Sequence, residues 1–261
     1  MHFVTLTTDW KKDDYYTGAI KGNILSRCND TIVVTITNQI KQHNVSEAAF
    51  IIRNSYNHYP QGSIHIITVG TSNSKDSAFI AASIDDHYFL MPDNGIAGLL
   101  GDSEPTEVIN LTNSKNAASR SFPAFDIFCP AACAIIKGTS LANLGNAYTE
   151  YSKQIPLRAT IENSTITGTI IHIDSFGNAI TNISEELFSR IGRSRVFNIY
   201  VQSKHYTISK IDKYYTDTSP GDLLALFNSI GLLEIGIRNG SAASLLNLNT
   251  DSTIRIEFKE Q

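Results

Sequence analysis

Short apolar runs alternate with helical patterns over the first part of the chain. Three runs are apolar and β-branched, which is typical of buried strands: residues 3–8 (FVTLTT), 32–37 (IVVTIT) and 64–69 (IHIITV). Apolar positions at helical spacing follow the first run from Tyr15 to Cys28. The same spacing follows the second run, with Ser46 as the expected N-cap and an apolar face made of Val45, Ala48, Ala49 and Ile52. This alternation predicts a parallel sheet covered by helices.

The middle of the chain predicts a hairpin, a further strand and a helix. The three expected strands are residues 78–83 (AFIAAS), 87–91 (HYFLM) and 108–111 (VINL). The first two flank Asp85 and Asp86, and they predict a β-hairpin that turns at this pair. An apolar helix is expected from about Pro130 to Lys137.

A change of pattern between roughly residues 138 and 165 predicts a domain junction. The alternating segments that follow it are TITGTIIHIDSFG, RVFNIYVQ, HYTISKI, DLLALFN, LLEIGI and STIRIEFK. They favour a small antiparallel sheet or barrel, interrupted by one helix at Ser241 to Leu246. We therefore expect an α/β domain with a mainly parallel sheet over residues 1–155, and a small all-β, barrel-like domain over residues 165–261.

The charge balance restricts the class of partner. The chain has 261 residues, of which 42% are hydrophobic and 18% charged, as in ordinary globular proteins. Lys and Arg number 21 against 25 Asp and Glu, which gives a formal charge of -4. Nucleic-acid binding needs clustered positive charge, so nucleic acid is not expected as a partner.

Cysteine usage and hydropathy predict a cytoplasmic protein. Cys28, Cys129 and Cys133 are too few for a disulfide framework and lack a matching pair at zinc spacing, so we interpret them as reduced core thiols. The first ten residues have no charged segment followed by an apolar one, as a secretory signal would. No uninterrupted apolar run approaches the ~18 residues of a membrane span, so no membrane association is expected.

Common catalytic motifs do not assign a function. The sequence has no Walker A loop, no G-x-G-x-x-G, no G-x-S-x-G and no H-E-x-x-H. His65 and His172 both lie inside expected strands, where a core or edge histidine is favoured over a catalytic one.

Four polar clusters at strand ends are more informative. They are Thr7-Thr8-Asp9, Pro92-Asp93-Asn94-Gly95, the segment from His172 to Asn182, and Asn228-Ser229. Asp9 follows a strand at the carboxyl edge of the expected parallel sheet, where ligands of open α/β sheets bind, and its carboxylate suits a ribose diol. Asn94-Gly95 is equally compatible with a plain tight turn, and Ser229 either holds a carboxylate or caps a turn.

Five motifs in a fixed order resemble those of the S-adenosylmethionine hydroxide adenosyltransferases, relatives of the fluorinase and chlorinase enzymes. The motifs are LTTDW…DYYTGAIKG, YPQGSIHI, PDNG, HIDSFGNAITNI and NSIGLLEIGIRNGSAASLL, and they cover nearly the whole chain. The resemblance implies an N-terminal α/β domain, a C-terminal β-barrel-like domain, and a homotrimer with ligand sites between subunits.

The family reaction is an attack by water at the ribose C5′ of S-adenosylmethionine, which expels methionine. The resemblance implies that an Asp, an Arg and a His handle this water. Counting without gaps between the GSIH and PDNG motifs puts Gly70 in the Asp column and Ser77 in the Arg column. The segment SFPAFDIFCP puts Pro123 in the His column. All three water-handling groups are replaced.

The expected ligand contacts are better retained. The resemblance assigns Asp9 to the ribose hydroxyls, Asp174 to the methionine ammonium, Phe176 and Asn178 to the adenine, Ser229 to the methionine carboxylate, and the backbone near Ala242 to the adenine edge. Further candidate contacts are Trp10, Asp93, Asn94 and Phe122. No metal and no separate cofactor is expected.

Three hypotheses follow from this combination. The chain is a hydrolase that acts slowly or with replacement groups such as Lys75 or Asp76, or a catalytically silent binder of adenosine or S-adenosylmethionine. The third is a related enzyme that uses another nucleophile or another nucleoside.

Overall fold

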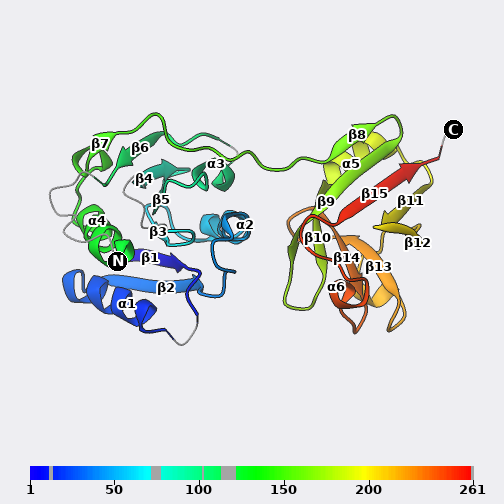
Figure 1. Cartoon of the computed structure of the whole chain (residues 1–261), viewed down its shortest axis with the longest axis horizontal. Helices are drawn as coiled ribbons and strands as arrows, with labels where there is room; N and C mark the ends of the chain where they lie inside the picture. Colours follow the sequence, from blue (N-terminus) through cyan, green and yellow to red (C-terminus); the bar gives the residue numbers. More distant parts are fainter. Residues whose placement is uncertain (12–13, 72–77, 102, 113–121, 260–261) are drawn as a thin grey trace. The chain divides into compact units, whose positions relative to one another are not determined.

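The computed structural model describes residues 1–11, 14–71, 78–101, 103–112 and 122–259. The chain divides into two compact units, Met1–Pro156 and Leu157–Gln261 (Figure 1).

The N-terminal unit is built on a seven-stranded sheet in the order β2-β1-β3-β5-β4-β6-β7. Its strands are β1 (His2–Thr7), β2 (Thr31–Thr37), β3 (Ile64–Ile67), β4 (Phe79–Ile84), β5 (His87–Pro92), β6 (Glu107–Asn110) and β7 (Asn146–Ala147). Strands β2, β1, β3 and β5 pair in parallel, as expected for the first three, whereas β5-β4, β4-β6 and β6-β7 are antiparallel. The sheet is therefore mixed, and the expectation of a mainly parallel sheet is corrected.

Helices cover both faces of this sheet. They are α1 (Tyr15–Arg27), α2 (Val45–Arg53), α3 (Ala97–Leu100) and α4 (Cys129–Ile136), with short turns η1 (Tyr56–His58), η2 (Ala124–Phe128) and η3 (Leu141–Asn143). One apolar core joins α1 and α4 to inward residues such as Leu6 and Ile66, and a second joins α2 and α3 to Phe89 and Met91. Alternate residues of the same strands feed the two cores, which gives three layers.

The hairpin prediction is confirmed, and one helix cap is corrected. Asp85 and Asp86 have φ of 48° and 62°, the left-handed pair that a two-residue hairpin turn requires. The N-cap of α2 is Asn44, whose side chain accepts a hydrogen bond from the Glu47 N–H at 3.1 Å, so the assignment to Ser46 is wrong. Ser46 lies within the helix, because the helix begins one residue earlier.

The C-terminal unit holds an eight-stranded antiparallel sheet that is nearly closed and barrel-like. Its strands are β8 (Thr160–Glu162), β9 (Thr165–Ile173), β10 (Ala179–Ser184), β11 (Phe197–Val201), β12 (Ser203–Ile208), β13 (Leu223–Phe227), β14 (Leu232–Ile237) and β15 (Thr253–Phe258). The order is β12-β11-β15-β9-β10-β14-β13, with β8 beside β9. The first half of β9 pairs with β15 and its second half with β10, so this one strand joins the two sides of a shared core.

The described residues of this unit form two helices, where one was expected. The expected helix is α6 (Ala242–Leu245), and the short turn η4 (Tyr215–Asp217) precedes β13. The unexpected helix is α5 (Glu185–Gly192), which Ser184 caps by accepting from the Leu187 N–H at 3.1 Å. The expectation of a barrel-like sheet is confirmed, and its all-β description is corrected by the addition of α5. The signal was present, because a serine followed by two acidic residues is typical of a helix start.

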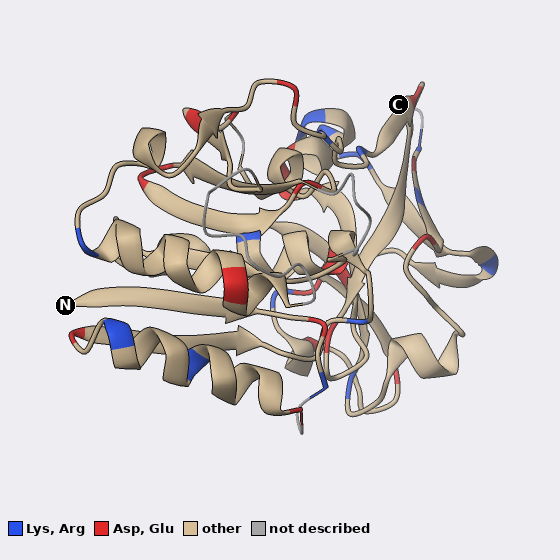
Figure 2. Cartoon of the chain, turned by 60° about the vertical axis from the view of Figure 1, so that its left-hand side comes forward, with Lys and Arg blue, Asp and Glu red and all other residues tan. Residues whose placement is uncertain are grey.

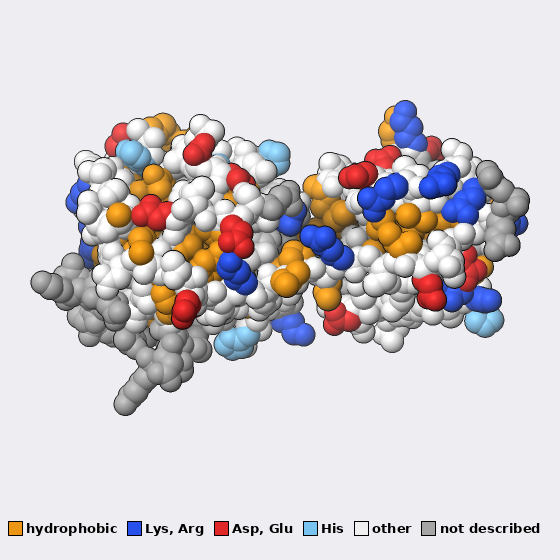
Figure 3. Space-filling model, turned by 90° about the horizontal axis from the view of Figure 1, so that it is seen from above, with side chains coloured by type: hydrophobic (Ala, Val, Ile, Leu, Met, Phe, Trp, Pro, Cys, Tyr) orange, Lys and Arg blue, Asp and Glu red, His pale blue; other side chains and the backbone are white. Residues whose placement is uncertain are grey.

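Lys, Arg, Asp and Glu residues are dispersed along the ribbon (Figure 2). On one face of the C-terminal unit, Lys and Arg side chains surround exposed hydrophobic atoms (Figure 3).

Cys28, Cys129 and Cys133 are free and buried. In the part of the chain that the structure describes, the helices are too short or too polar to cross a membrane.

Candidate functional site

The carboxyl ends of β1, β3 and β5 bring three sequence-predicted residues together. These strands are parallel neighbours, and Asp9, Gly70 and Asn94 follow their ends. The Asp9 carboxylate accepts hydrogen bonds through Oδ2 from the N–H of His43 at 3.0 Å and from the N–H of Gly70 at 3.2 Å. Two amides thus fix the half-buried carboxylate at the sheet edge where open α/β sheets bind ligands.

Gly70 lies close to the side chain of Asn94. Its φ is +67°, a left-handed conformation that glycine adopts without strain and that Asp and Asn adopt less often. A Cβ added there would stand 3.0 Å from the Nδ2 of Asn94. Asn94 is held in this position because its Nδ2 donates to the Val69 carbonyl at 3.0 Å. An Asp at the position where the resemblance expects a water-activating carboxylate would therefore have to displace the Asn94 amide by a few tenths of an ångström.

Aromatic rings lie close to the end of β1. Trp10 packs against Tyr16 and Phe122 with ring centroids 5.4 and 5.6 Å apart, and Tyr16 lies 5.1 Å from Phe122. Phe125 stacks on Phe122 at 5.8 Å. The structure thus brings the predicted Trp10 and Phe122 together and adds Tyr16 and Phe125, which the sequence analysis did not single out.

The other two water-handling columns offer no replacement among the described residues. Pro123 is buried with a φ of -56° and precedes η2, where its ring suits the start of a helix. Ser77 and the replacement groups Lys75 and Asp76 lie outside the described residues. The described part of these columns therefore presents no acid, base or guanidinium.

Asp93 is engaged in fastening another segment of the N-terminal unit. Its carboxylate accepts from the N–H of Ser152 at 2.7 Å and from the hydroxyl of Tyr148 at 3.1 Å. Gln154 donates through Nε2 to the Asn94 carbonyl at 3.0 Å. The turn after β5 thus anchors residues 148–154, and this contact gives Asp93 a structural role.

His65 belongs to the core of the N-terminal unit. Its Nδ1 lies 2.7 Å from the Thr5 hydroxyl and its Nε2 lies 3.1 Å from Nδ1 of His87. Burial, and next the neighbouring His87, lower the pKa of His65 to about 3. The interpretation of His65 as a core histidine is confirmed.

In the C-terminal unit, Asp174 shapes the loop between β9 and β10. Its Oδ1 accepts from the N–H groups of Phe176 at 2.9 Å and Asn178 at 2.8 Å, and its Oδ2 accepts from Asn178 Nδ2 at 3.1 Å. This arrangement leaves the Phe176 side chain 76% exposed while Asn178 is buried. An exposed ring beside a fixed carboxylate and carboxamide is suited to a flat, polar-edged ligand.

The same loop contacts the start of α6. Gly177 has a φ of +79°, and a Cβ there would lie 2.0 Å from the Ser241 hydroxyl. The Ala243 N–H donates to the Gly177 carbonyl at 2.9 Å. Ala242 is buried beside this contact, so the structure brings the predicted positions 174–178 and Ala242 into one region.

Ser229 lies exposed in the turn between β13 and β14. Asn228 builds this turn, because its Oδ1 accepts from the N–H groups of Ile230 at 3.2 Å and Leu232 at 3.1 Å. Gly231 completes the turn with a φ of +71°. The Ser229 hydroxyl therefore lies on a well-defined turn that is held by the side-chain hydrogen bonds of Asn228.

Glu234 was not singled out by the sequence analysis, although it is 3% exposed. Its Oε1 accepts from the Tyr215 hydroxyl at 2.5 Å and its Oε2 accepts from Asn228 Nδ2 at 3.2 Å. Burial and the hydrogen bond to Glu234 raise the pKa of Tyr215, and Asp174 adds to the rise. The available signal was a charged residue inside the apolar run LLEIGI.

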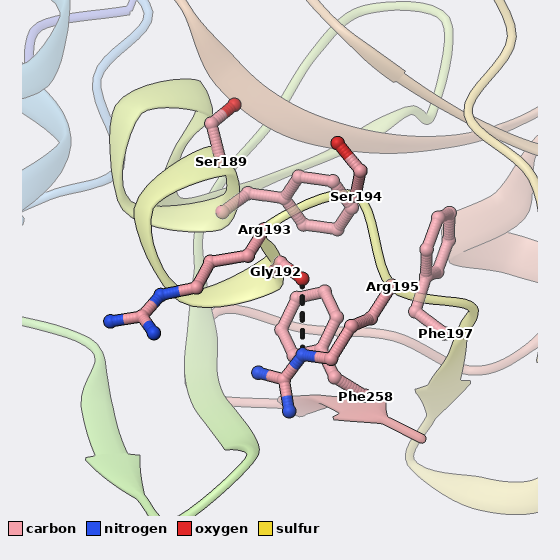
Figure 4. Close-up of a pocket in the computed structure, with 8 residues that line it drawn as sticks. Ser189, Gly192, Arg193, Ser194, Arg195, Phe197 and Phe258 are labelled. Carbon is pink, nitrogen blue, oxygen red and sulfur yellow. Dashed lines mark hydrogen bonds between the residues drawn. The ribbon is translucent and has the colours of Figure 1, made fainter. Parts of the chain in front are cut away.

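A pocket of about 300 Å³ lies elsewhere in the C-terminal unit (Figure 4). It is lined by Phe188, Ser189, Gly192, Arg193, Ser194, Arg195, Phe197 and Phe258. The Arg195 guanidinium donates to the Gly192 carbonyl at 3.1 Å and to the Ile191 carbonyl at 2.7 Å. These bonds satisfy the carbonyls at the end of α5, so Arg195 has a structural role. The described lining includes none of the predicted ligand contacts.

The described residues also show whether side chains are grouped to bind a metal ion. Among the described side chains, no group of three or more His, Cys, Asp or Glu residues is arranged to hold a metal ion.

Both units of the chain match the models of one protein family. The family model described as SAM hydroxide adenosyltransferase N-terminal domain matches residues 4–145, and the corresponding C-terminal domain model matches residues 168–255. A relative from Methanocaldococcus jannaschii, named (R)-S-adenosyl-L-methionine hydrolase, is 26% identical over 99% of this chain and 97% of its own. A relative of the same name from Salinispora tropica is 25% identical over 97% of both chains.

Solved structures agree with the fold. An uncharacterized conserved protein from Thermotoga maritima has a TM-score of 0.86 at 25% identity, covering 97% of this chain and 99% of its own. A conserved hypothetical protein from Thermus thermophilus has a TM-score of 0.76 at 23% identity, covering 98% of this chain and 100% of its own.

Proposed function

Because the chain belongs to the SAM hydroxide adenosyltransferase family, we propose that it binds S-adenosylmethionine and hydrolyses it far more slowly than a member with the full water-handling set. The observation that carries this proposal is the contrast between Asp9 and Gly70. Asp9 is present and held by two backbone amides, whereas Gly70 has no carboxylate and lies close to Asn94.

The N-terminal unit supplies the ribose contact in this proposal. Oδ2 of Asp9 is occupied by the amides of His43 and Gly70, and the second oxygen is suited to the two ribose hydroxyls. Trp10 and Phe122 provide an apolar wall close to the same strand end. This combination of one charged acceptor and a ring surface fits the sugar and sulfonium part of the ligand.

The C-terminal unit supplies the contacts to adenine and to the amino acid. Phe176 presents an exposed ring for stacking, and Asn178 lies beside it with a carboxamide. In this proposal Asp174 binds the ammonium group and Ser229 donates to the carboxylate. A ligand with a cationic and an anionic end matches this pair.

Slow turnover follows from the chemistry of the displacement. Attack at C5′ expels methionine as a neutral thioether, which leaves a sulfonium readily. The protein therefore mainly has to orient and activate the attacking water. Losing a positioned base commonly lowers the rate by about 10²- to 10⁴-fold. Gly70 and Pro123 provide no such group.

A second candidate function is hydrolysis by rebuilt groups. The relatives named (R)-S-adenosyl-L-methionine hydrolase match nearly the full length of this chain, and this likeness favours an active member. Lys75 or Asp76 would then replace the missing groups. A double substitution of Lys75 and Asp76 to Ala, with adenosine release as the readout, separates this candidate from slow background turnover.

We further propose that the protein is a homotrimer in which subunits share ligand sites. Membership of the family supports this proposal, and the expected contacts are divided between the two units of the chain. Light scattering after gel filtration tests it, with a mass three times that of the chain as the expected result and a monomer as the contrary one.

Thermal stabilisation by ligand tests the binding proposal. A ligand that binds only the folded state adds about 2.7 kcal/mol of stability at 100 times its dissociation constant. S-adenosylmethionine, offered as both epimers at sulfur, is expected to raise the melting temperature, and Asp9→Ala is expected to abolish the rise. The proposal fails if saturating ligand leaves the melting temperature unchanged.

A further inference from the structure

Glu234 is a buried carboxylate whose hydrogen-bond partners are neutral. Both oxygens are engaged, one by the Tyr215 hydroxyl at 2.5 Å and the other by Asn228 Nδ2 at 3.2 Å. No Lys or Arg within the described ranges forms an ion pair with it. A buried charge without an ion-pair partner costs stability unless its hydrogen bonds are well made, so this carboxylate has little freedom to move.

Through Asn228, Glu234 reaches the turn that carries Ser229. The Asn228 side chain uses its Nδ2 for Glu234 and its Oδ1 for the N–H groups of Ile230 and Leu232. The side-chain amide of Asn228 is therefore clamped between the strand and the turn. Any shift of the Glu234 carboxylate would tilt that amide and move the residue next to it, Ser229.

The Asp174 loop lies over the same face of β14. The Oδ1 of Asn178 is 2.9 Å from the place where a Cβ of Gly236 would stand, so Asn178 covers Gly236. Gly236 and Glu234 are two residues apart on one strand, which puts them on one face at about 7 Å. Asn178 in turn donates to Asp174 at 3.1 Å. The raised pKa of Tyr215, to which both Glu234 and Asp174 contribute, agrees with this arrangement.

We propose that Glu234 is a positioning residue which, through Asn228, holds the turn of Ser229 at the spacing from Asp174 that the amino-acid end of the ligand requires. This inference rests on the proposed function, in which Asp174 binds the ammonium and Ser229 the carboxylate. Glu234 does not touch the ligand. Its effect is confined to ligands that carry the zwitterionic amino acid, and a nucleoside without that group does not depend on it.

Two variants and two ligands test the proposal. Glu234→Gln keeps the shape but turns one acceptor into a donor that faces Tyr215 or Asn228, and Tyr215→Phe removes one hydrogen bond. Because Glu234→Gln loosens the hydrogen bonds that hold the Ser229 turn, it is expected to weaken S-adenosylmethionine binding about tenfold or more by calorimetry. Binding of adenosine by the same variant is expected to stay within about twofold of the wild type.

The control is Glu257→Gln, which changes a Glu in β15 of the same unit whose partner is Arg255. It is expected to leave both affinities unchanged. Equal weakening of both ligands by Glu234→Gln, or no weakening of either, overturns the positioning role. If Glu234→Gln does not fold, Tyr215→Phe carries the test, because it removes only a hydroxyl from a side chain that is 45% exposed. Failure of the wild type to bind either ligand refutes the proposed function instead, and with it this inference.

Discussion

The backbone N–H of Gly70 donates to the carboxylate of Asp9 at 3.2 Å. This bond joins the residue proposed to bind the ribose to the position where the family resemblance expects a carboxylate. Gly70 has a φ of +67°, and its N–H helps to hold the Asp9 carboxylate. In the proposed function, this strand end binds the ribose and has no side chain at position 70 to activate water.

Gly70→Ala is expected to lower the free energy of unfolding by more than the backbone penalty of a residue with a positive φ. The left-handed conformation costs a residue with a Cβ about 1–2 kcal/mol, and the new Cβ would also displace Asn94 from its place 3.0 Å away. Urea unfolding gives the free energy of each variant.

The matched control for that prediction is Gly62→Ala. Gly62 has a φ of +78° and no atom within 4 Å of an added Cβ, so it reports the backbone penalty by itself. We expect Gly70→Ala to lose about 1 kcal/mol more than Gly62→Ala, and Asn94→Ala to remove most of that excess. Equal losses at both glycines would show that Asn94 does not restrict residue 70.

Restoring the three family residues is expected to fail as a repair. The combined variant Gly70→Asp, Ser77→Arg and Pro123→His introduces the missing groups, but the Cβ of an Asp at position 70 would lie 3.0 Å from the Asn94 Nδ2 and disturb the hydrogen bonds there. We expect adenosine release to stay within about tenfold of the wild type, well short of the roughly 10²- to 10⁴-fold that a positioned base supplies. Chromatography of the products measures it, and a gain of several hundredfold would show that the site can accept the groups.

Asp9→Asn is expected to separate folding from binding. The Asn oxygen can still accept from the amides of His43 and Gly70, so unfolding by urea is expected to change by less than about 1 kcal/mol. The neutral side chain is a weaker acceptor for ribose hydroxyls, so affinity for S-adenosylmethionine is expected to fall about tenfold. Asp30→Asn serves as the control, because Asp30 pairs with the N-terminal amine at the surface. Unchanged affinity in Asp9→Asn would exclude Asp9 as the charged contact.

Acid is expected to destabilise the N-terminal unit through His65. Burial lowers the pKa of His65 to about 3, whereas the unfolded chain protonates near the ordinary value of 6.5. The neutral form therefore stabilises the fold fully above pH 6.5, and this contribution is lost as the pH falls from 6.5 toward 3. The slope of the unfolding free energy from His65 approaches about 1.4 kcal/mol per pH unit in that window.

A pair of variants isolates this effect from the carboxylates that also titrate in acid. His65→Gln cannot titrate, so its unfolding free energy between about pH 6.5 and 5 is expected to fall less steeply than that of the wild type. His58→Gln changes an exposed histidine and is expected to keep the wild-type slope. Identical slopes in all three proteins would assign the acid sensitivity to other groups.

The local pattern predicted most elements, but it did not predict the neighbours of each strand. Apolar runs and turn signals located β1, α1, β2, α2 and β3 as well as the hairpin at Asp85 and Asp86. The pattern of β5 is the same whether its neighbours are parallel or antiparallel, so the mixed pairing of the sheet was not accessible. Helix α5 was missed because its eight residues lie between β-like segments.

The sequence predicted only part of the candidate site. Asp9 and Asn94 follow strand ends, and a parallel sheet brings such positions to one edge. The close approach of Asn94 to position 70 depends on a backbone angle and on the rotamer of Asn94, which no spacing in the sequence encodes. The apolar run around Glu234 indicated its burial, but its hydrogen-bond donors, Tyr215 and Asn228, lie 19 and 6 residues away and could not be predicted.

Equilibrium dialysis against labelled S-adenosylmethionine, followed by chromatography of the label in the protein chamber, tests the central claim most directly. The account predicts saturable retention of label that elutes mainly as intact S-adenosylmethionine, with no more than about one equivalent of adenosine and methionine formed per protein over a few hours. Absence of retained label, or conversion of many equivalents to adenosine and methionine within that time, would contradict it.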